Sequence, residues 1–237
     1  MNAPTVEIKK FETRADWVQA LADKMATQIK QKLQSDGTAS IALSGGRSPA
    51  PMLDALSGHD LDWQNVTVTL VDDRWVPVGS DRSNEALVRN HLLQGPAAAA
   101  QFIGLTTDHK TPEEGLDGVE RQLSTLPLPF ASLFIGLGED GHTASLFPCA
   151  PAQELAQGFA PNEEQKVAAI NPESQPEARI TLTLPTILNS DHIALFIYGE
   201  EKWQVFEEAM KNGPEEELPI RAVLRGAKTP IEVYWAP

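Results

Sequence analysis

The sequence predicts an α/β fold in which a mostly parallel sheet is covered by helices on both faces. Short apolar runs that are typical of buried strands alternate with amphipathic segments that are typical of helices along the whole chain. Such alternation favours parallel strands joined by helices that pack on both faces of the sheet. No internal repeat and no linker of disordered composition interrupts the pattern, so we expect one domain over residues 1–237.

Composition narrows the class of function. The 237 residues are 41% hydrophobic, which supports a substantial core, and their formal net charge is −14. That charge argues against nucleic acid and anionic membranes as partners, although a local basic pocket can still bind an anionic small molecule. Cys149 is the single cysteine and has no internal disulfide partner. Without a secretory signal or an apolar stretch of roughly 20 residues, we expect a cytoplasmic protein, as a monomer or a weak homo-oligomer.

The chain begins with a long helix and a strand. Residues 13–34 carry apolar side chains at every fourth position from Trp17 to Leu33, and Gly37 follows as a stop signal. This stripe predicts an amphipathic helix packed on the core. Residues 40–43 read Ser-Ile-Ala-Leu and predict a short buried strand.

A glycine turn follows that strand. Its residues are Ser44, Gly45, Gly46, Arg47, Ser48 and Pro49. We expect Ser48 to cap a following helix, with Pro49 in its first turn. A strand, a Gly-Gly turn and a helix N-terminus together form an anion site, because backbone N–H groups and the helix dipole point at the ligand. Arg47 would add charge to this site, and a plain connecting turn is the alternative.

The next strand ends in charged residues. Residues 66–71 are apolar or β-branched, and Asp72, Asp73 and Arg74 follow directly. Charges at a strand end are costly to bury unless they pair or face a ligand. Arg74 suits a phosphate because its guanidinium offers two parallel N–H donors, but an internal Asp–Arg pair that shapes the loop is the alternative. Residues 83–85 predict a helix cap.

Three more predicted segments follow this helix cap. We expect a loop or frayed helix end at 94–100, a strand at 102–105 and a helix at 111–126.

The stretch 136–148, G-L-G-E-D-G-H-T-A-S-L-F-P, follows an apolar strand at 133–135. Its glycines, Gly136, Gly138 and Gly141, allow a tight turn that presents Asp140 and His142 at the carboxyl end of the strand. Ligands bind at that end in open α/β sheets. A histidine in this place is a candidate general base.

Other chemistries fit this stretch less well. Its glycines match G-x-G-x-x-G, but Pro148 follows too soon for the long helix that a dinucleotide-binding turn requires. Cys149 lacks a separate His–Asn/Asp pattern and is interpreted as a small buried residue. The remaining histidines have no metal-ligand spacing and no paired cysteines exist, so we predict no metal.

The last third of the chain supplies two more basic candidates. Arg179 heads a strand at 179–184 whose alternation predicts a half-buried strand, and Lys202 lies in the first turn of a helix after Gly199. Arg179 would close a pocket, or remain a solvated charge. A first-turn lysine opposes the helix dipole, which hints at a ligand, although a solvated lysine is the alternative. The other predictions are a surface loop at 150–161, strands at 167–170, 192–198 and 231–235, and a short helix at 219–224.

A His–Asp pair, a glycine anion turn and basic side chains at strand ends together fit an enzyme that acts on a phosphorylated small molecule by proton transfer. Four segments of the chain resemble the 6-phosphogluconolactonase family, within a wider superfamily of sugar-phosphate isomerases and deaminases. These segments are 43–49, 72–77, 136–148 and 179–183, and they span most of the chain. The chain has Asp73 where the family usually has glutamate.

The resemblance implies a Rossmann-like three-layer fold, no metal, no organic cofactor and a phosphosugar lactone as partner. It implies hydrolysis of 6-phospho-D-glucono-1,5-lactone, with His142 as the catalytic histidine and Asp140, or alternatively Asp72, as the residue that orients it. The residues we expect to bind substrate or phosphate are Ser44, Gly45, Gly46, Arg47, Ser48, Asp72, Arg74, Gly138, Gly141, Arg179 and Lys202.

Two alternative functions remain open. A glucosamine-6-phosphate deaminase resembles this chain at Asp140-Gly141-His142 but carries N-E-P where this chain has Leu146, Phe147 and Pro148. The missing carboxylate at Phe147 argues against amine chemistry. A non-catalytic sugar-phosphate sensor is the other alternative, and His142 argues against it because binding alone needs no titratable base.

Overall fold

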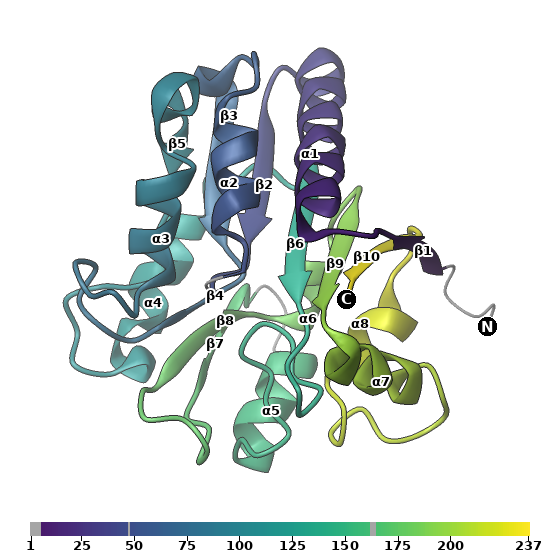
Figure 1. The fold of residues 1–237 in the computed structure, drawn as a ribbon. Coiled ribbons are helices and arrows are strands. Elements are labelled where there is room, and N and C mark those ends of the chain that lie inside the picture. Colours follow the sequence, from purple (N-terminus) through teal and green to yellow (C-terminus); the bar gives the residue numbers. More distant parts are fainter. Residues whose placement is uncertain (1–5, 47, 162–164) are drawn as a thin grey trace.

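The computed structural model describes residues 6–46, 48–161 and 165–237 and is built on a parallel sheet of seven strands. Every pair of neighbours in this sheet is parallel, as Figure 1 shows. The strands are β1 (Val6–Lys10), β2 (Ala39–Leu43), β3 (Val66–Leu70), β5 (Gln101–Phe102), β6 (Ser132–Gly136), β9 (Ile193–Tyr198) and β10 (Ile231–Ala236).

The strand order is β1-β10-β9-β6-β2-β3-β5. From β2 the chain builds outward through β3 and β5, and from β6 it builds in the other direction through β9 and β10. The order therefore reverses between β2 and β6, which is the place where open α/β sheets bind ligands.

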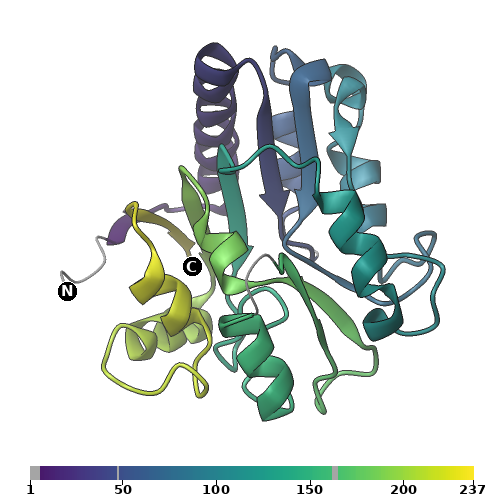
Figure 2. The same cartoon turned by 180° about the vertical axis from the view of Figure 1, so that it is seen from behind.

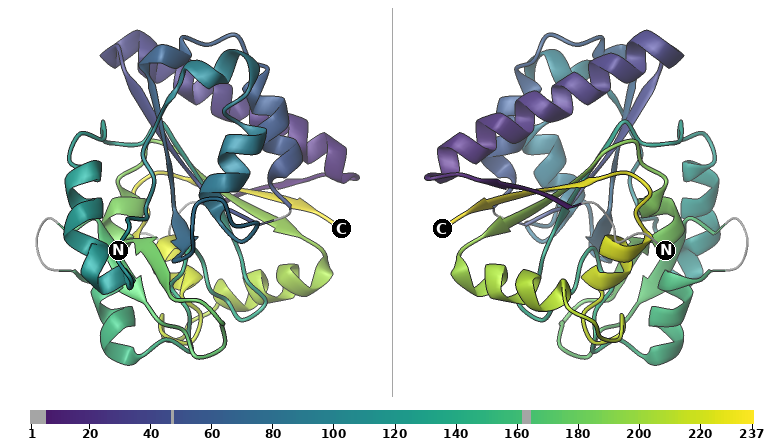
Figure 3. Two further views of the ribbon diagram at one scale, coloured as in Figure 1. Left: turned by 90° about the vertical axis from the view of Figure 1, so that its left-hand side faces the viewer. Right: turned by 90° about the vertical axis from the view of Figure 1, so that its right-hand side faces the viewer.

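Helices cover both faces of the sheet, and the prediction of a three-layer α/β fold is confirmed. Helices α1, α2 and α3 pack side by side on one face, and α4, α6 and α8 lie on the other, as Figures 2 and 3 show. The helices are α1 (Arg14–Asp36), α2 (Ala50–Ser57), α3 (Asn84–His91), α4 (Pro112–Leu123), α5 (Ala152–Phe159), α6 (Leu184–Leu188), α7 (Glu200–Ala209) and α8 (Ile220–Gly226). Two short 3₁₀ turns cover Trp63–Asn65 and Gly95–Ala99.

The helix ends follow the local signals in the sequence. Thr13 accepts a hydrogen bond from the backbone N–H of Asp16 at the start of α1, and Gly37 ends that helix with φ of 77°. Ser83 accepts from the N–H of Ala86 at the start of α3. The expected cap at Ser48 is wrong, because Pro49 already has helical dihedral angles and occupies the cap position of α2 without a side-chain bond.

A second, antiparallel sheet of three strands lies below the carboxyl edge of the first (Figure 1). Its order is β4 (Asp72–Arg74), β8 (Arg179–Leu182) and β7 (Val167–Ile170). This sheet was not predicted from the sequence. It carries Arg74 directly opposite Arg179, and so brings two distant segments of the chain together.

One apolar cluster fills the space between the main sheet and its helices and reaches the second sheet through Ile180 and Leu182. Within it, the rings of Trp17, Phe196 and Phe134 stack in series, with centroids 5.5 and 4.9 Å apart. Phe196 thereby connects the core to the carboxyl edge of the sheet.

Several sequence predictions need correction. Residues 152–159 form α5 rather than a loop: Pro151 precedes the helix, and Gly158 lies where a Cβ would be 2.5 Å from Leu146. The strand at 179–182 is buried on both faces, because Thr181 is covered and accepts a hydrogen bond from the backbone N–H of Ser145. The strand predicted at 102–105 covers only Gln101–Phe102.

Strand β1 and helix α6 were not predicted from the sequence.

Among the described residues, no helix combines the length and the apolar character that crossing a bilayer requires.

Candidate active site

A cavity of about 350 Å³ opens at the carboxyl edge of the sheet, where the strand order reverses. Its walls come from the turn after β2, from β4, from the turn after β6, from β8 and from α7. Of the predicted site residues, Ser44, Gly45, Gly46, Ser48, Asp72, Arg74, Gly138, His142, Arg179 and Lys202 line this cavity.

His142 lies in the turn that follows β6. The N–H of Gly141 bonds to the carbonyl of Gly138 at 3.1 Å, and the N–H of Gly138 bonds to the carbonyl of His142 at 2.9 Å. A Cβ at Gly138 would lie 2.1 Å from Nδ1 of His142, so the imidazole packs directly on the glycine backbone. On its other side the ring stacks on Phe147, with centroids 4.2 Å apart. The ring is therefore fixed between a glycine and an aromatic side chain.

Asp140 contacts this imidazole directly. Its Oδ1 forms a short hydrogen bond with Nδ1 of His142 and also accepts the backbone N–H of the same residue at 3.1 Å. Burial alone would raise the pKa of Asp140, but the hydrogen bonds and charge of His142 outweigh it and hold the pKa below its ordinary value. An ionised carboxylate keeps the proton on Nδ1, which leaves Nε2 as the nitrogen available to take a proton.

Arg74 and Arg179 form a positive wall. They are register partners on the antiparallel strands β4 and β8, and both line the cavity. Like charges directly opposite each other destabilise a strand pair unless an anion lies between or beside them. Burial lowers the pKa of Arg179, and the charge of Arg74 lowers it further, while the charge of Asp72 opposes the shift. Lys202, in the first turn of α7, adds a third cation to the lining.

The two aspartates after β3 have different surroundings. Asp72 lines the cavity, and its carboxylate accepts a hydrogen bond from Oγ of Ser145. Asp73 is fully buried and accepts the backbone N–H groups of Arg74, Asn84 and Glu85. Burial raises the pKa of Asp73 to about 6 despite these bonds. Asp73 therefore fastens the start of α3 to β4 rather than facing a ligand.

The glycine turn after β2 forms the floor of the cavity. Gly46 has a φ of 101°, a backbone conformation that residues other than glycine rarely adopt. Ser48 lines the cavity, and its carbonyl accepts a hydrogen bond from Arg14 at 2.9 Å. Arg47, predicted to add charge here, lies outside the described residues.

Gly141 supports the turn from behind. Its φ is 82°, a Cβ there would lie 2.3 Å from the side chain of Leu218, and its carbonyl accepts the N–H of Ile220. It is not among the described residues that line the cavity, so its predicted binding role stays a prediction.

Two polar residues that line the cavity, Asn84 and Gln175, were not predicted as site residues. Asn84 was predicted only as part of a helix cap, and Gln175 was not singled out. Gln175 Oε1 accepts a hydrogen bond from Nη2 of Arg179 at 2.9 Å. No local pattern signals either contact, because each depends on which strands pair.

Cys149 is half-buried rather than buried, and its sulfur lies 3.1 Å from Oγ of Ser174. Within the described part of the chain, no group of three or more His, Cys, Asp or Glu side chains is arranged to hold a metal ion.

The chain is similar to known proteins over nearly its whole length. A family model described as glucosamine-6-phosphate isomerases/6-phosphogluconolactonase matches residues 12–235. A 6-phosphogluconolactonase from Mesorhizobium japonicum is 39% identical over 237 residues, which cover 100% of this chain and 98% of that protein. One from Neisseria meningitidis serogroup B is 40% identical, covering 96% of this chain and 97% of the relative.

Solved structures agree with this likeness. The crystal structure of a 6-phosphogluconolactonase from Shewanella baltica matches with a TM-score of 0.95 and 40% identity, over 99% of both chains. The likeness therefore extends over the whole chain and not only over its motifs.

Proposed function

Because this chain belongs to the 6-phosphogluconolactonase family, we propose that it hydrolyses 6-phospho-D-glucono-1,5-lactone to 6-phospho-D-gluconate in the oxidative pentose phosphate pathway. The observation that carries the proposed mechanism is the position of His142. Its Nδ1 is held by the carboxylate of Asp140, and its ring lines the same cavity as Arg74 and Arg179. A cavity that holds both a base and two arginines suits a substrate with an uncharged lactone ring at one end and a phosphate at the other, because the base acts on the lactone while the arginines bind the phosphate.

In the proposed mechanism, Nε2 of His142 takes a proton from water as the water oxygen attacks the lactone carbonyl. Asp140 stabilises the resulting imidazolium through Nδ1. Backbone N–H groups of the glycine turns stabilise the oxyanion of the tetrahedral intermediate. The imidazolium then gives its proton to the ring oxygen as the C–O ester bond breaks, and the new carboxylic acid releases its own proton to solvent.

The phosphate is assigned to the other end of the cavity. It would lie against the turn at residues 44–48, with Arg74 and Arg179 as charge partners and Lys202 as a further cation. A dianion between Arg74 and Arg179 relieves the repulsion of two like charges on paired strands. Arginine suits this place because its planar fork can donate two parallel hydrogen bonds to one phosphate.

The test is a lactonase assay on freshly generated 6-phosphogluconolactone, with spontaneous hydrolysis subtracted. For His142→Ala we expect kcat to fall by about 10²–10⁴-fold, since that is the usual contribution of a general base, with KM nearly unchanged. His91→Ala is the matched control, because His91 is a surface residue that contacts Asp54. Turnover like that of the wild type in His142→Ala would exclude the base assignment.

Glucosamine 6-phosphate is the competing substrate to include. Phe147, and not a carboxylate, stacks on His142, so we expect no ammonia release from this sugar. Ammonia release at a rate comparable to lactone hydrolysis would favour the deaminase alternative. Phosphosugar binding without turnover of either substrate would favour a sensor.

A further inference from the structure

We propose that Asn84 is a positioning residue that holds the Arg74 guanidinium against the cavity wall. This inference rests on the proposed function, because it gives Arg74 its role as a partner of the substrate phosphate. Asn84 is the first residue of α3 and is only 3% exposed, yet its side chain lines the cavity.

Asn84 bonds to each of the three residues of β4. Its side-chain Nδ2 donates to the carbonyl of Asp72 at 2.8 Å, and its backbone N–H donates to Oδ1 of Asp73 at 2.7 Å. Its Oδ1 accepts a hydrogen bond from Nη1 of Arg74 at 3.1 Å. A single residue therefore fixes the backbone of β4 and the end of its arginine side chain.

The same amide lies on the glycine turn after β2. A Cβ at Gly45 would be 1.7 Å from Oδ1 and 2.0 Å from Cγ of Asn84, a distance at which real atoms cannot coexist. Gly45 is not one of the glycines with a positive φ. The close contact with Asn84, and not the backbone conformation, therefore explains why residue 45 is a glycine. Asn84 thus joins the two segments that form the proposed phosphate site.

Arg74 needs such a tether. It lies opposite Arg179, and repulsion between the two guanidinium groups would otherwise separate them. The side-chain hydrogen bonds that the structure gives Arg74 use Nη1, which donates to the carbonyl of Arg82 at 2.8 Å and to Asn84. Holding a long side chain in its bound position before the ligand arrives lowers the entropic cost of binding.

A purely structural role for the amide is less consistent with the contacts. The start of α3 is already capped by Ser83, which accepts from the N–H of Ala86, and by Asp73, which accepts from the N–H of Glu85. The Asn84 side chain makes no bond to the backbone of its own helix among those the structure describes. Ser83→Ala is therefore the matched control, since it weakens the same helix end without touching Arg74.

The experiment compares KM for 6-phosphogluconolactone and the inhibition constant of inorganic phosphate in four variants. For Asn84→Ala we expect both constants to rise about tenfold while kcat changes less than threefold, as for the loss of a charge-assisted hydrogen bond. For Ser83→Ala we expect a lower Tm with both constants unchanged. Arg74→Ala should raise both constants at least as much as Asn84→Ala.

The double variant Asn84→Ala/Arg74→Ala decides the route of the effect. If Asn84 acts through Arg74, the double variant has the same constants as Arg74→Ala alone. Additive effects, or an unchanged KM in Asn84→Ala, would overturn the proposal. An unchanged KM in Arg74→Ala would instead overturn the phosphate assignment in the proposed function.

A second variant covers the case in which Asn84→Ala does not fold. Gly45→Ala keeps the asparagine but pushes its amide away from Arg74, and it should raise both constants in the same direction. Constants in Gly45→Ala equal to those of the wild type would also overturn the proposal.

Discussion

At the scale of single residues, the site depends on close approach. The imidazole of His142 contacts the backbone at Gly138, the ring of Phe147 and the carboxylate of Asp140. These contacts fix the plane of the ring and the nitrogen that carries the proton. Positioning of this kind matters because a catalytic group displaced by about 1 Å can lose about 10²-fold in rate.

Gly138→Ala tests this positioning. The added methyl group would lie 2.1 Å from Nδ1 and 2.2 Å from Cε1 of His142, so the ring must move. We expect kcat to fall by about 10²-fold with a smaller change in Tm. Gly79→Ala is the control, because a Cβ at Gly79 meets nothing within 4 Å. Equal kcat in the two variants would show that the packing of the ring does not matter.

Asp140→Asn tests the orientation of the imidazole. An amide keeps the shape of the side chain but cannot fix the proton on Nδ1 or stabilise the imidazolium. We therefore expect kcat to fall by roughly 10²–10⁴-fold, with KM nearly unchanged. The lowered pKa of Asp140 also means that its carboxylate is ionised at every pH above the ordinary pKa of an aspartate, so its protonation should not limit the rate in that range.

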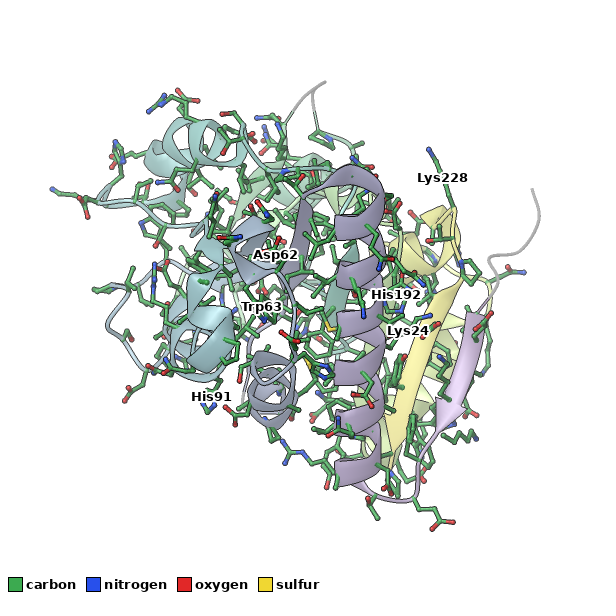
Figure 4. The ribbon with its side chains drawn as sticks, turned by 90° about the horizontal axis from the view of Figure 1, so that it is seen from above. Lys24, Asp62, Trp63, His91, His192 and Lys228 are labelled. Atoms are coloured by element: carbon green, nitrogen blue, oxygen red, sulfur yellow. The ribbon has the colours of Figure 1, made fainter. Side chains whose placement is uncertain are left out.

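Measuring kcat and KM as a function of pH tests both the expected fall in kcat of Asp140→Asn and the expected absence of an effect of Asp140 protonation in the wild type. The exposed Asp62→Asn is the control, because Asp62 precedes β3 at the opposite edge of the sheet from the cavity (Figure 4). A kcat in Asp140→Asn equal to that of the control would remove Asp140 from the mechanism.

At the scale of elements, a half-buried ionic cluster joins α1, β1, β10 and the residue before β9, away from the cavity. Glu232 on β10 accepts hydrogen bonds from Lys9 at 2.7 Å and Tyr234 at 2.6 Å, and it pairs with Lys24 on α1 at 3.0 Å. His192 lies 3.3 Å from the same carboxylate, and Figure 4 shows Lys24 and His192 close together between α1 and β10. The cluster fastens the long helix and the edge strand to the sheet.

Glu232→Gln tests this cluster. Burial would raise the pKa of Glu232, but its contacts with His192, Lys9, Tyr234 and Lys24 hold it well below its ordinary value. A pKa lower in the folded than in the unfolded chain means that ionised Glu232 stabilises the fold above about pH 4.3, and that this stabilisation is lost as the pH falls further. We expect the variant to be less stable at pH 7 by about 2–4 kcal/mol.

Denaturant unfolding at pH 7 and at pH 3 measures the difference between wild type and Glu232→Gln. The difference should shrink at the lower pH. The exposed Glu7→Gln, on the neighbouring strand, should change stability by less than about 0.5 kcal/mol. A difference that grows at low pH would contradict the assigned direction of the pKa shift.

At the scale of the whole molecule, the strand order decides where the site lies. Parallel strands on either side of the β2–β6 junction deliver their carboxyl ends to one edge, and the second sheet closes that edge from below. A single apolar cluster extends from the main sheet into Ile180 and Leu182 of the second. The two sheets therefore share one core, as a single domain requires.

Calorimetry tests the single-domain prediction. We expect one unfolding transition in which the calorimetric and van't Hoff enthalpies agree, because the shared core couples both sheets. Phe134→Ala, which removes a fully buried ring from the core, should lower the stability of that single transition by about 3–5 kcal/mol. Two separated transitions, of which Phe134→Ala shifts only one, would show two domains.

Much of the fold and the centre of the site could be predicted from local sequence. Apolar runs and caps located six of the strands in the main sheet, and the turn 136–148 placed Asp140 two residues from His142. A contact within one turn is decided by the residues of that turn, because glycine sets its backbone and no distant partner is needed. Parallel strands also place the turns after β2 and β6 at a common edge.

The tertiary structure alone decided the rest of the cavity. Arg179 meets Arg74 because β8 pairs antiparallel with β4, and Asn84 meets Gly45 because α3 packs across the turn after β2. These contacts join segments far apart in the chain, and their register comes from strand pairing and core packing. A side chain such as Asn84 or Gln175 has the same local pattern in a plain helix cap or turn, so only its distant partner reveals its place in the site.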